Sequence, residues 1–395
     1  MRSRRIRYSS RLVHAESRFR AWFRKKRGTV LIVRVDAIGD FVLFRPCLPY
    51  YKLLFPDKRV VLLTTEADAS LLANESLVDQ IIPMQRSRFI ADPHYQRGFL
   101  AELRAAAAEI AVYPTYTREA YVDRLIYALG SRERIAFRDT RMDLPRIRRR
   151  NDLFTRLVEP GEKPMHEVER NKEFLQHFGV AVTGYDFSLK PSPADEEFAR
   201  SVQQTLSPQG PVVVVAPGSS KPRKIWPVKN FIDVGHRLAS SFNAVFVLVG
   251  SEVELPLGCA FAEALRGRCA NLIGATTLLQ LYALMKRATI YLGNDTGPKH
   301  IAAAAGLPVV EICCHPHGGD PAHFNSPVRF GAYGVPRRVL QPEPLPPCSR
   351  FCSATDCAHC IANNSPEAAF HGAMELLTDW WYPGVPCSGG VAVCK

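Results

Sequence analysis

The chain has 395 residues, of which 47% are hydrophobic and 23% are charged. This length predicts two domains of ordinary size, and this composition is typical of globular proteins rather than of disordered or fibrous ones. The sequence contains no stretch of about 18 uninterrupted apolar residues, so it predicts no hydrophobic transmembrane helix.

The positive charge is concentrated at the amino terminus. Of the formal net charge of +13, residues 1–28 contribute +10, from eleven Lys and Arg residues and one acid, Glu16, which leaves +3 for the rest of the chain. Because the basicity belongs to this arm, we expect no nucleic-acid-binding body and no nucleic-acid partner.

The arm also carries an apolar stripe. Its apolar residues recur at helical spacing, at Leu12, Ala15, Phe19, Trp22 and Phe23. A basic amphipathic helix of this kind lies in a membrane interface, so we expect a cytoplasmic protein held peripherally on the inner face of the cytoplasmic membrane. The alternative is a solvated basic tail. The arm lacks the uninterrupted apolar core of a signal peptide.

Eleven cysteines are present, and an odd total without a secretion signal favours a reducing cytosol. Cys348, Cys352, Cys357 and Cys360 are spaced C-x3-C-x4-C-x2-C. Because four ligands within so short a segment rarely enclose a tetrahedral zinc ion, we expect a cysteine-rich loop, with a structural zinc as the alternative. We expect neither a catalytic metal nor a cofactor.

The first part of the chain alternates strands and helices. In chain order we expect strand 29–35, turn 36–40, helix 41–55, strand 59–65, helix 66–74, strand 78–84, helix 100–108, strand 109–113, strand 132–137, an arginine-rich loop 138–151 and helix 166–178. Such alternation predicts parallel strands joined by helical crossovers.

A second alternation follows a connection, 188–210, in which we expect prolines around a polar helix. We expect strand 211–216, helix 228–240, strand 244–249, helix 255–266, strand 270–272, helix 277–287, strand 289–292, helix 296–305, strand 309–313, loops over 314–362 and helix 366–381. The fold class is therefore α/β, with two Rossmann-like doubly wound domains facing a central cleft. The predicted divisions are the arm 1–28, domain 29–190, linker 191–210, domain 211–345, and a cysteine-rich loop, helix and tail over 346–395.

Ligands of doubly wound sheets bind beyond the carboxyl ends of the strands, so the loops there are informative. The first is Asp36-Ala-Ile-Gly-Asp40. Asp40 is predicted to lie at a helix amino terminus, where the helix dipole favours its ionised form and suits it to act as a base. The alternative is an ordinary helix-capping aspartate.

Three loops of the second domain are suited to a nucleotide diphosphate. In 216–227, Ser219, Ser220 and Lys224 provide donors and a cation for an anion, unless this is a solvated basic loop. In Gly293-Asn-Asp-Thr-Gly-Pro-Lys-His300, the helix amino terminus leaves N–H groups for phosphate. The loop 250–252 supplies Glu252 as a weaker candidate for contact with ribose.

The set DAIGD, PGSSKPRKIWP, GSE and GNDTGPKHIAAAAG resembles glycosyltransferase family 9, the ADP-heptose:lipopolysaccharide heptosyltransferases, over roughly residues 29–375. The resemblance implies a GT-B fold and metal-independent transfer with inversion. It implies that Asp40 is the catalytic base. It further implies donor contacts from Ser219, Ser220, Lys224, Glu252, Asp295, Thr296, Gly297 and His300.

The resemblance also implies the partners: a nucleotide-diphosphate sugar, with ADP-heptose first, and a lipid-linked anionic saccharide. For the acceptor we expect contacts from Arg148, Arg149 and Arg150, unless they form a solvated surface. The family's Gly-Pro-Thr-Asp-like stretch is replaced by 313–323 here, which leaves the sugar open. The alternatives are a transferase using another nucleotide sugar in polysaccharide assembly, or a non-catalytic nucleotide-binding protein. No G-x-G-x-x-G follows the first strand of either domain, which disfavours a dinucleotide oxidoreductase.

Overall fold

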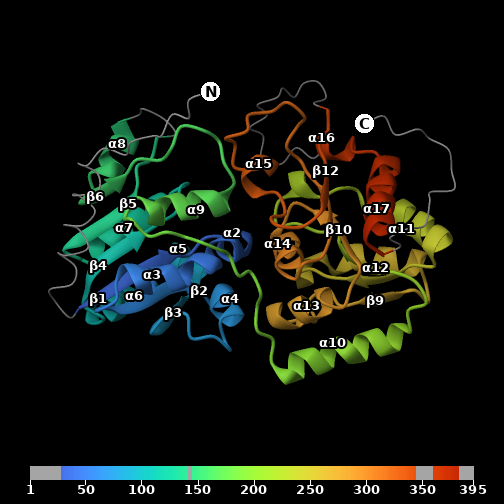
Figure 1. Cartoon of the computed structure of the whole chain (residues 1–395), viewed down its shortest axis with the longest axis horizontal. Helices are drawn as coiled ribbons and strands as arrows, with labels where there is room; N and C mark the ends of the chain where they lie inside the picture. Colours follow the sequence, from blue (N-terminus) through green and yellow to red (C-terminus); the bar gives the residue numbers. More distant parts are fainter. Residues whose placement is uncertain (1–27, 141–144, 344–358, 382–395) are drawn as a thin grey trace, which may run out of the picture. The chain divides into compact units, whose positions relative to one another are not determined.

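The computed structural model describes residues 28–140, 145–343 and 359–381. The chain divides into two compact units, Met1–Phe187 and Ser188–Lys395. Each unit is built on its own six-stranded sheet, and the paired strands of both sheets run parallel (Figure 1). The predicted pair of Rossmann-like α/β domains is therefore confirmed.

The sheet of the first unit has the strand order β3-β2-β1-β4-β5-β6. Its strands are β1 (Thr29–Arg34), β2 (Arg59–Thr65), β3 (Gln80–Met84), β4 (Ala108–Tyr113), β5 (Glu133–Phe137) and β6 (Arg156–Val158). β1 and β2 are almost wholly buried, because helices cover both faces of a parallel sheet. Their runs of Val, Leu and Ile made these two strands predictable.

The helices of the first unit depart more from expectation. They are α2 (Ile38–Phe44), α3 (Leu48–Leu54), α4 (Glu66–Leu71), α5 (Arg86–Ala91), α6 (Pro93–Ala105), α7 (Ala120–Ala128), α8 (Pro145–Asn151) and α9 (Glu167–Gln176). The single helix expected over 41–55 is divided by a 3-10 turn, Arg45–Cys47, since Pro46 and Pro49 have no N–H to donate. The loop expected over 138–151 was wrong in its second half, where α8 forms.

The sheet of the second unit has the order β12-β11-β10-β7-β8-β9. Its strands are β7 (Val212–Ala216), β8 (Val245–Leu248), β9 (Cys269–Asn271), β10 (Ile290–Asn294), β11 (Val309–Ile312) and β12 (Arg337–Leu340). β12 was not predicted, because this edge strand begins with two exposed arginines instead of an apolar run. The helices are α10 (Pro193–Leu206), α11 (Val228–Phe242), α12 (Leu255–Ala264), α13 (Leu278–Met285), α14 (Gly297–Ala304), α15 (Pro327–Phe330), α16 (His359–Ala362) and α17 (Pro366–Trp381).

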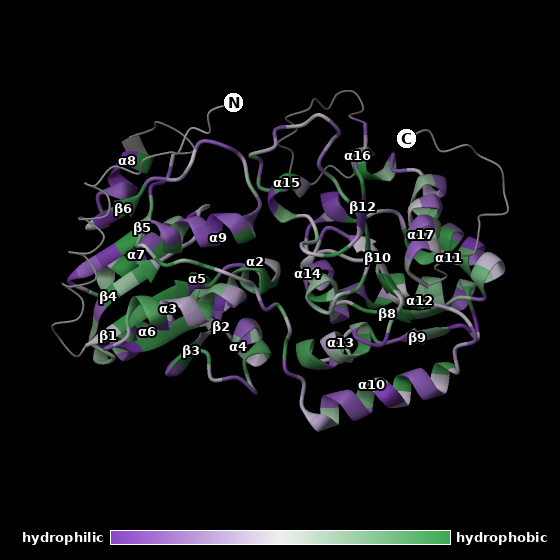
Figure 2. Ribbon diagram, viewed as in Figure 1, coloured by the Kyte–Doolittle hydropathy of each residue, from purple (hydrophilic) through white to green (hydrophobic). Residues whose placement is uncertain are grey.

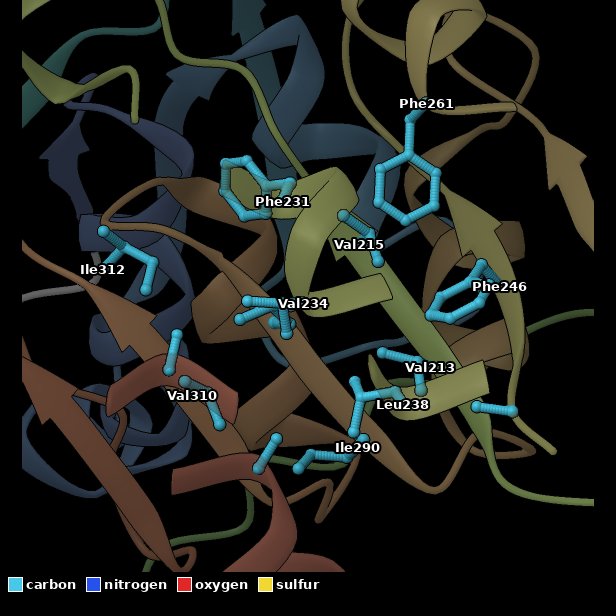
Figure 3. Packing of buried hydrophobic residues seen from close by; sticks show 14 of the residues in the cluster. Val213, Val215, Phe231, Val234, Leu238, Phe246, Phe261, Ile290, Val310 and Ile312 are labelled. Carbon is cyan, nitrogen blue, oxygen red and sulfur yellow. The ribbon is translucent and has the colours of Figure 1, made fainter. Parts of the chain in front are cut away.

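The core of the second unit joins its central strands to α11 and α12 (Figure 3). Phe231, Val234 and Leu238 repeat at helical spacing on α11, and all three are fully buried. They lie against the alternating inward residues of the sheet. The labelled members of this cluster include Val213, Val215, Phe246, Phe261, Ile290, Val310 and Ile312. This core fixes the strands whose carboxyl ends carry the predicted donor loops.

Helix α10 occupies most of the stretch expected to be a linker, 191–210. Ser192 and Asp195 form a capping box at its start, which satisfies two of the N–H groups that a helix end leaves over. The helix is largely hydrophilic in Figure 2, but it packs against α13 and buries Ala199. It is thus an ordered part of the second unit.

Several predictions fall on residues that the structure does not describe. Residues 1–27 of the basic arm lie outside the described residues, as do Cys348, Cys352 and Cys357. Cys360 lies in α16. Within the ranges that are described, no helix combines the length and the apolar character needed to cross a membrane.

Candidate active site

The predicted donor loops of the second unit lie at one edge of its sheet. Strands β8, β7, β10 and β11 are consecutive neighbours and parallel, so the loops that follow them leave from the same edge. These loops carry Glu252, the basic segment 217–227, the Asp295 turn and the segment 313–326.

Asn294 ties two of these loops together. It is fully buried at the end of β10, and its side-chain amide donates to the carbonyl of Pro217 at 2.8 Å. Its side-chain oxygen accepts the backbone N–H of Trp226 at 3.2 Å. Both ends of the basic segment are therefore anchored to the strand that leads into the Asp295 turn. This role of Asn294 was not predicted, although a polar asparagine at the end of an apolar strand is visible in the sequence.

Lys224 and Asp295 form the central ion pair of the site. The Lys224 Nζ lies 2.7 Å from Asp295 Oδ2 and 3.3 Å from the Asp295 carbonyl oxygen. Burial alone lowers the pKa of Lys224, but the Asp295 carboxylate outweighs it, so the pKa is raised. The pairing keeps Lys224 charged and directs its ammonium group to the start of α14.

A second lysine, Lys299, is completely buried beneath this pair. Its Nζ is held by Asp295 Oδ1 at 2.5 Å, by Glu311 Oε1 at 2.8 Å and by the carbonyl of Phe330 at 2.7 Å. Burial would raise the pKa of Asp295, but Lys299 and Lys224 outweigh it and hold that pKa well below its usual range. Burial raises the pKa of Glu311 despite its lysine neighbour.

The same cluster bears on metal binding. In the described part of the chain, Asp295, Glu311 and Cys313 form one group whose ligand atoms lie within 4.8 Å of one another. The Lys299 ammonium already contacts two of its three members, Asp295 and Glu311, and Lys224 supplies a second positive charge beside Asp295. A buried lysine thus takes the place that a cation would need. Glu311 inside the buried strand VVEI was the sequence signal for such a partner.

The remaining predicted donor residues of these two segments lie close in sequence to Lys224 or to Asp295. Thr296 is the N-cap residue of α14, although its side chain makes no capping hydrogen bond, and helix geometry leaves its N–H and that of Gly297 without a carbonyl one turn earlier. His300 is buried one turn into the helix. Ser219 accepts the N–H of Lys221 at 3.2 Å, and Ser220 is exposed.

Glu252 and Glu254 follow β8. Glu252 is exposed, whereas the carboxylate of Glu254 accepts the N–H of Ser251 at 2.7 Å. It also lies against Gly218 and leaves no room for a side chain there. Glu254 is therefore a residue of the site that sequence reasoning missed, because a glutamate in a helical turn carries no distinctive signal.

In the first unit, Asp36 and Asp40 follow β1. The buried guanidinium of Arg34 lies 2.9 Å from Asp36 and donates to the backbone carbonyl of Asp40 at 3.2 Å. Burial lowers the pKa of Arg34, but the carboxylates of Asp36 and Asp40 outweigh it and raise the pKa. Thr115, after β4, donates to Asp36 at 3.2 Å. Asp40 is half-buried in the first turn of α2, as predicted from its place after the strand.

Asp68 is an unpredicted carboxylate at the same edge. It is fully buried in α4, with the hydroxyls of Thr65 and Thr64 donating to it at 2.7 and 3.2 Å. Burial raises its pKa to about 7, beyond what those hydrogen bonds offset. A pocket of about 630 Å³ lies nearby, lined by residues that follow β2 and β3, among them Glu66, Arg86 and Arg88.

The three arginines expected to contact an acceptor do not share one environment. Arg148 and Arg149 are exposed on α8. Arg150 lies 2.7 Å from Asp123 and 3.4 Å from Asp139, and it donates to the carbonyl of Arg118 at 2.8 Å. The guanidinium of Arg150 thus holds α8 to α7 and to the loops after β4 and β5.

Replacing Lys299 by methionine tests the buried cluster. The substitution removes the cation between two buried carboxylates, so we expect the free energy of unfolding to fall by about 3–5 kcal/mol in urea denaturation. Lys299→Met/Glu311→Leu should recover part of this loss, since one carboxylate leaves with its partner. The exposed Lys286→Met is the control, and a loss below about 1 kcal/mol for Lys299→Met would contradict the account.

Asp68→Asn tests the buried carboxylate. A folded-state pKa above the unfolded one means that stability is fully present below about pH 4 and lost as pH rises to about 7. The amide cannot ionise and still accepts a hydrogen bond, so thermal unfolding should show a gain of about 1–3 kcal/mol over wild type at pH 8, shrinking toward pH 4. Asp79→Asn should show no such gain, because hydrogen bonds from Lys52 and Val60 outweigh desolvation and lower the Asp79 pKa. Equal gains at both pH values would argue against ionisation as the cause.

The segment that carries the predicted donor residues is similar to known proteins. A model of glycosyltransferase family 9 (heptosyltransferase) matches residues 125–314, which include every predicted donor residue but not Asp40. The lipopolysaccharide core heptosyltransferase OpsX of Haemophilus influenzae is 26% identical over 165 residues, which are 41% of this chain and 46% of the relative. The match thus spans about half the length of that curated relative.

Solved structures share the fold over nearly their whole length. A glycosyltransferase family 9 structure from Veillonella parvula superposes with a TM-score of 0.72 at 16% identity, covering 89% of this chain and 98% of that one. An E. coli heptosyltransferase with ADP-2-deoxy-2-fluoro heptose gives a TM-score of 0.61 at 17% identity, covering 88% and 99%. The family match, the curated relative and the shared GT-B fold together show that the chain resembles the heptosyltransferases of glycosyltransferase family 9.

Proposed function

We propose that the chain transfers a heptose, or a related sugar, from a nucleotide-diphosphate donor to a lipopolysaccharide core or another surface glycan. ADP-heptose is our first candidate for the donor. The observation that carries the proposal is the meeting of Lys224, Asp295 and the start of α14 at one sheet edge, inside the segment that matches the family.

The donor diphosphate is proposed to bind at the amino terminus of α14. The N–H groups of Thr296 and Gly297 and the helix dipole favour an anion there. Lys224 adds a cation that Asp295 holds in place. These groups would stabilise the charge that grows on the leaving diphosphate, which is the task that a metal ion performs in other transferases.

The chemical step is proposed as a direct displacement. Asp40 takes the proton of an acceptor hydroxyl as the oxygen attacks the anomeric carbon, and the bond to the diphosphate oxygen breaks on the opposite face. A single displacement of this kind inverts the anomeric centre. The nearby Arg34 favours a negative charge on Asp40. Transfer requires the two units to bring Asp40 to the bound donor, and this part rests on the resemblance.

The identity of the donor sugar has a second candidate. The segment 313–323 departs from the family pattern and follows β11, next to the proposed diphosphate site, so the donor could instead be another nucleotide sugar.

The proposed position is the cytoplasmic face of the inner membrane. The basic arm 1–28 supports this position, because a lipid-linked acceptor would be reached there.

A donor panel tests the proposed function. ADP-heptose and representative UDP-, GDP- and TDP-sugars are compared by thermal shift in EDTA, so that binding without divalent metal is measured. A ligand at 100 times its dissociation constant stabilises by about 2.7 kcal/mol, and we expect ADP-heptose to do so. Lys224→Met should lose this shift and the exposed Lys229→Met should keep it. A wild-type chain that no member of the panel stabilises would refute the proposal.

Asp40→Asn tests the catalytic base. The amide cannot accept the proton, so turnover should fall by about 100- to 10,000-fold while the dissociation constant of the donor stays within about twofold. Transfer is measured by release of the nucleoside diphosphate in the presence of acceptor. The matched control is Asp57→Asn, at an exposed aspartate of the same unit. Near-normal turnover in Asp40→Asn would exclude it as the base.

Arg148→Glu/Arg149→Glu tests the acceptor surface. Because both side chains are exposed and cationic, reversing their charge should raise the KM for a phosphorylated acceptor about five- to tenfold with little change in the KM for donor. Arg150 is left intact because of its internal ion pairs. Arg97→Glu, at an exposed position on α6, is the control, and an unchanged acceptor KM would remove these two arginines from the acceptor site.

A further inference from the structure

The segment after β11 contains a column of three neighbouring rings, each tilted against the next. The His315 and His323 ring centroids are 5.5 Å apart, and those of His323 and Phe324 are 4.2 Å apart at an interplanar angle of 32°. His315 is buried at one end of the column, whereas Phe324 is 46% exposed at the other. The three rings therefore lead from the interior of the unit to its surface.

The column is held in place by polar contacts at its base. A ring nitrogen of His315 lies 3.0 Å from the carbonyl of Asp320, and the side-chain amide of Gln341 donates to the His315 carbonyl at 3.2 Å. Arg329 donates to the carbonyl of Ala322 at 3.0 Å, directly before His323. Rings fixed in this way offer a preformed surface, which costs a ligand little ordering entropy.

Two cations of the basic segment lie over the exposed ring. The Phe324 centroid is 5.7 Å from Lys221 Nζ and 5.2 Å from Arg223 Cζ, so the segment after β11 touches the segment after β7. Cys314, at the start of the same segment, is acted on electrostatically by Lys224, Asp295 and Arg223. The column thus borders the proposed diphosphate site directly.

The order of the strands gives the column a place along the donor. A nucleotide sugar is linear, with the diphosphate between the nucleoside and the sugar. Glu252, the nucleoside candidate, follows β8, and the diphosphate groups follow β7 and β10. The next strand is β11, whose segment carries the three rings. A donor laid across the edge in this order would bring its sugar to Phe324.

We infer that the column of His315, His323 and Phe324 is the sugar-binding wall of the donor site and selects the transferred sugar. The exposed part of Phe324 contacts the apolar face of the sugar ring, and the Nε2–H of His323 donates to a hydroxyl. His315 is a positioning residue that supports the column. This inference rests on the proposed function and adds to it the residues that discriminate between sugars.

The chemistry of the imidazoles fits a neutral polar ligand. Burial lowers the pKa of His323, and the neighbouring His315 and Arg223 lower it further. Burial also lowers the pKa of His315. The Nδ1 of His323 accepts the backbone N–H of Asn325 at 3.2 Å, so a neutral ring carries its proton on Nε2 and can donate it to a sugar hydroxyl. An aromatic wall with a few placed polar groups is the usual form of a small-ligand site.

The test separates sugar recognition from diphosphate binding. Dissociation constants for ADP and for ADP-heptose, or for whichever donor of the panel binds most tightly with its own nucleoside diphosphate, are measured by calorimetry without acceptor. The ratio of the two constants reports the contribution of the sugar. Phe324→Ala should reduce this ratio about three- to tenfold, with His323→Ala acting in the same direction. Phe324→Leu, which keeps bulk without a ring, should lie between Phe324→Ala and wild type.

Val328→Ala is the matched control, because Val328 is 47% exposed on α15 yet outside the column. The inference is overturned by a ratio near one in the wild type, by an unchanged ratio in Phe324→Ala, or by a ratio that falls equally in Val328→Ala. Failure of every panel member to bind the wild-type chain would instead overturn the proposed function, and this inference with it.

Discussion

The candidate site of the second unit depends on a lysine that never reaches solvent. Lys299 lies between the carboxylates of Asp295 and Glu311 and also donates to the carbonyl of Phe330, so one ammonium group joins α14, the turn after β10, β11 and α15. Asp295 passes this constraint on to Lys224. An isolated ion of either sign would be strongly unfavourable in this interior, and the cluster is tolerated because two ammonium groups balance two carboxylates. The buried Lys299 therefore fixes, through Asp295, the position of Lys224, the cation proposed to bind the diphosphate.

Parallel strand order supplies the second constraint. Each loop that leaves the carboxyl edge of β8, β7, β10 and β11 carries a different chemistry, from an acidic turn through cations and helix N–H groups to a column of rings. The buried Asn294 fastens the basic segment to the Asp295 turn from both ends. The site thus needs little regular structure of its own, because a rigid sheet spaces its loops.

The strands and the loops of the candidate site could be predicted from residue patterns. Buried strands such as Val212–Ala216 are unbroken apolar runs, and the loops that follow them contain the predicted site residues. Asp40 could be placed at a helix start for the same reason. Position along the chain does not reveal which charges face one another across a fold. Lys299 in an alanine-rich helix and Glu311 in a buried strand each look anomalous alone, and only the tertiary structure shows them as a pair. Similarly, Arg150 is indistinguishable in sequence from its exposed neighbours Arg148 and Arg149, yet its contacts are internal.

The burial of the Lys299 cluster determines how this part of the protein responds to ionic strength. Mobile ions attenuate interactions between exposed charges beyond roughly 8 Å at physiological ionic strength, but they hardly enter a buried pair. The ammonium group of Lys299 and the carboxylates of Asp295 and Glu311 are almost fully buried, so dissolved ions hardly weaken their attraction. The structure at this edge of the sheet should therefore change little with salt concentration. Interactions of the exposed Arg148 and Arg149 on α8 should weaken as salt rises.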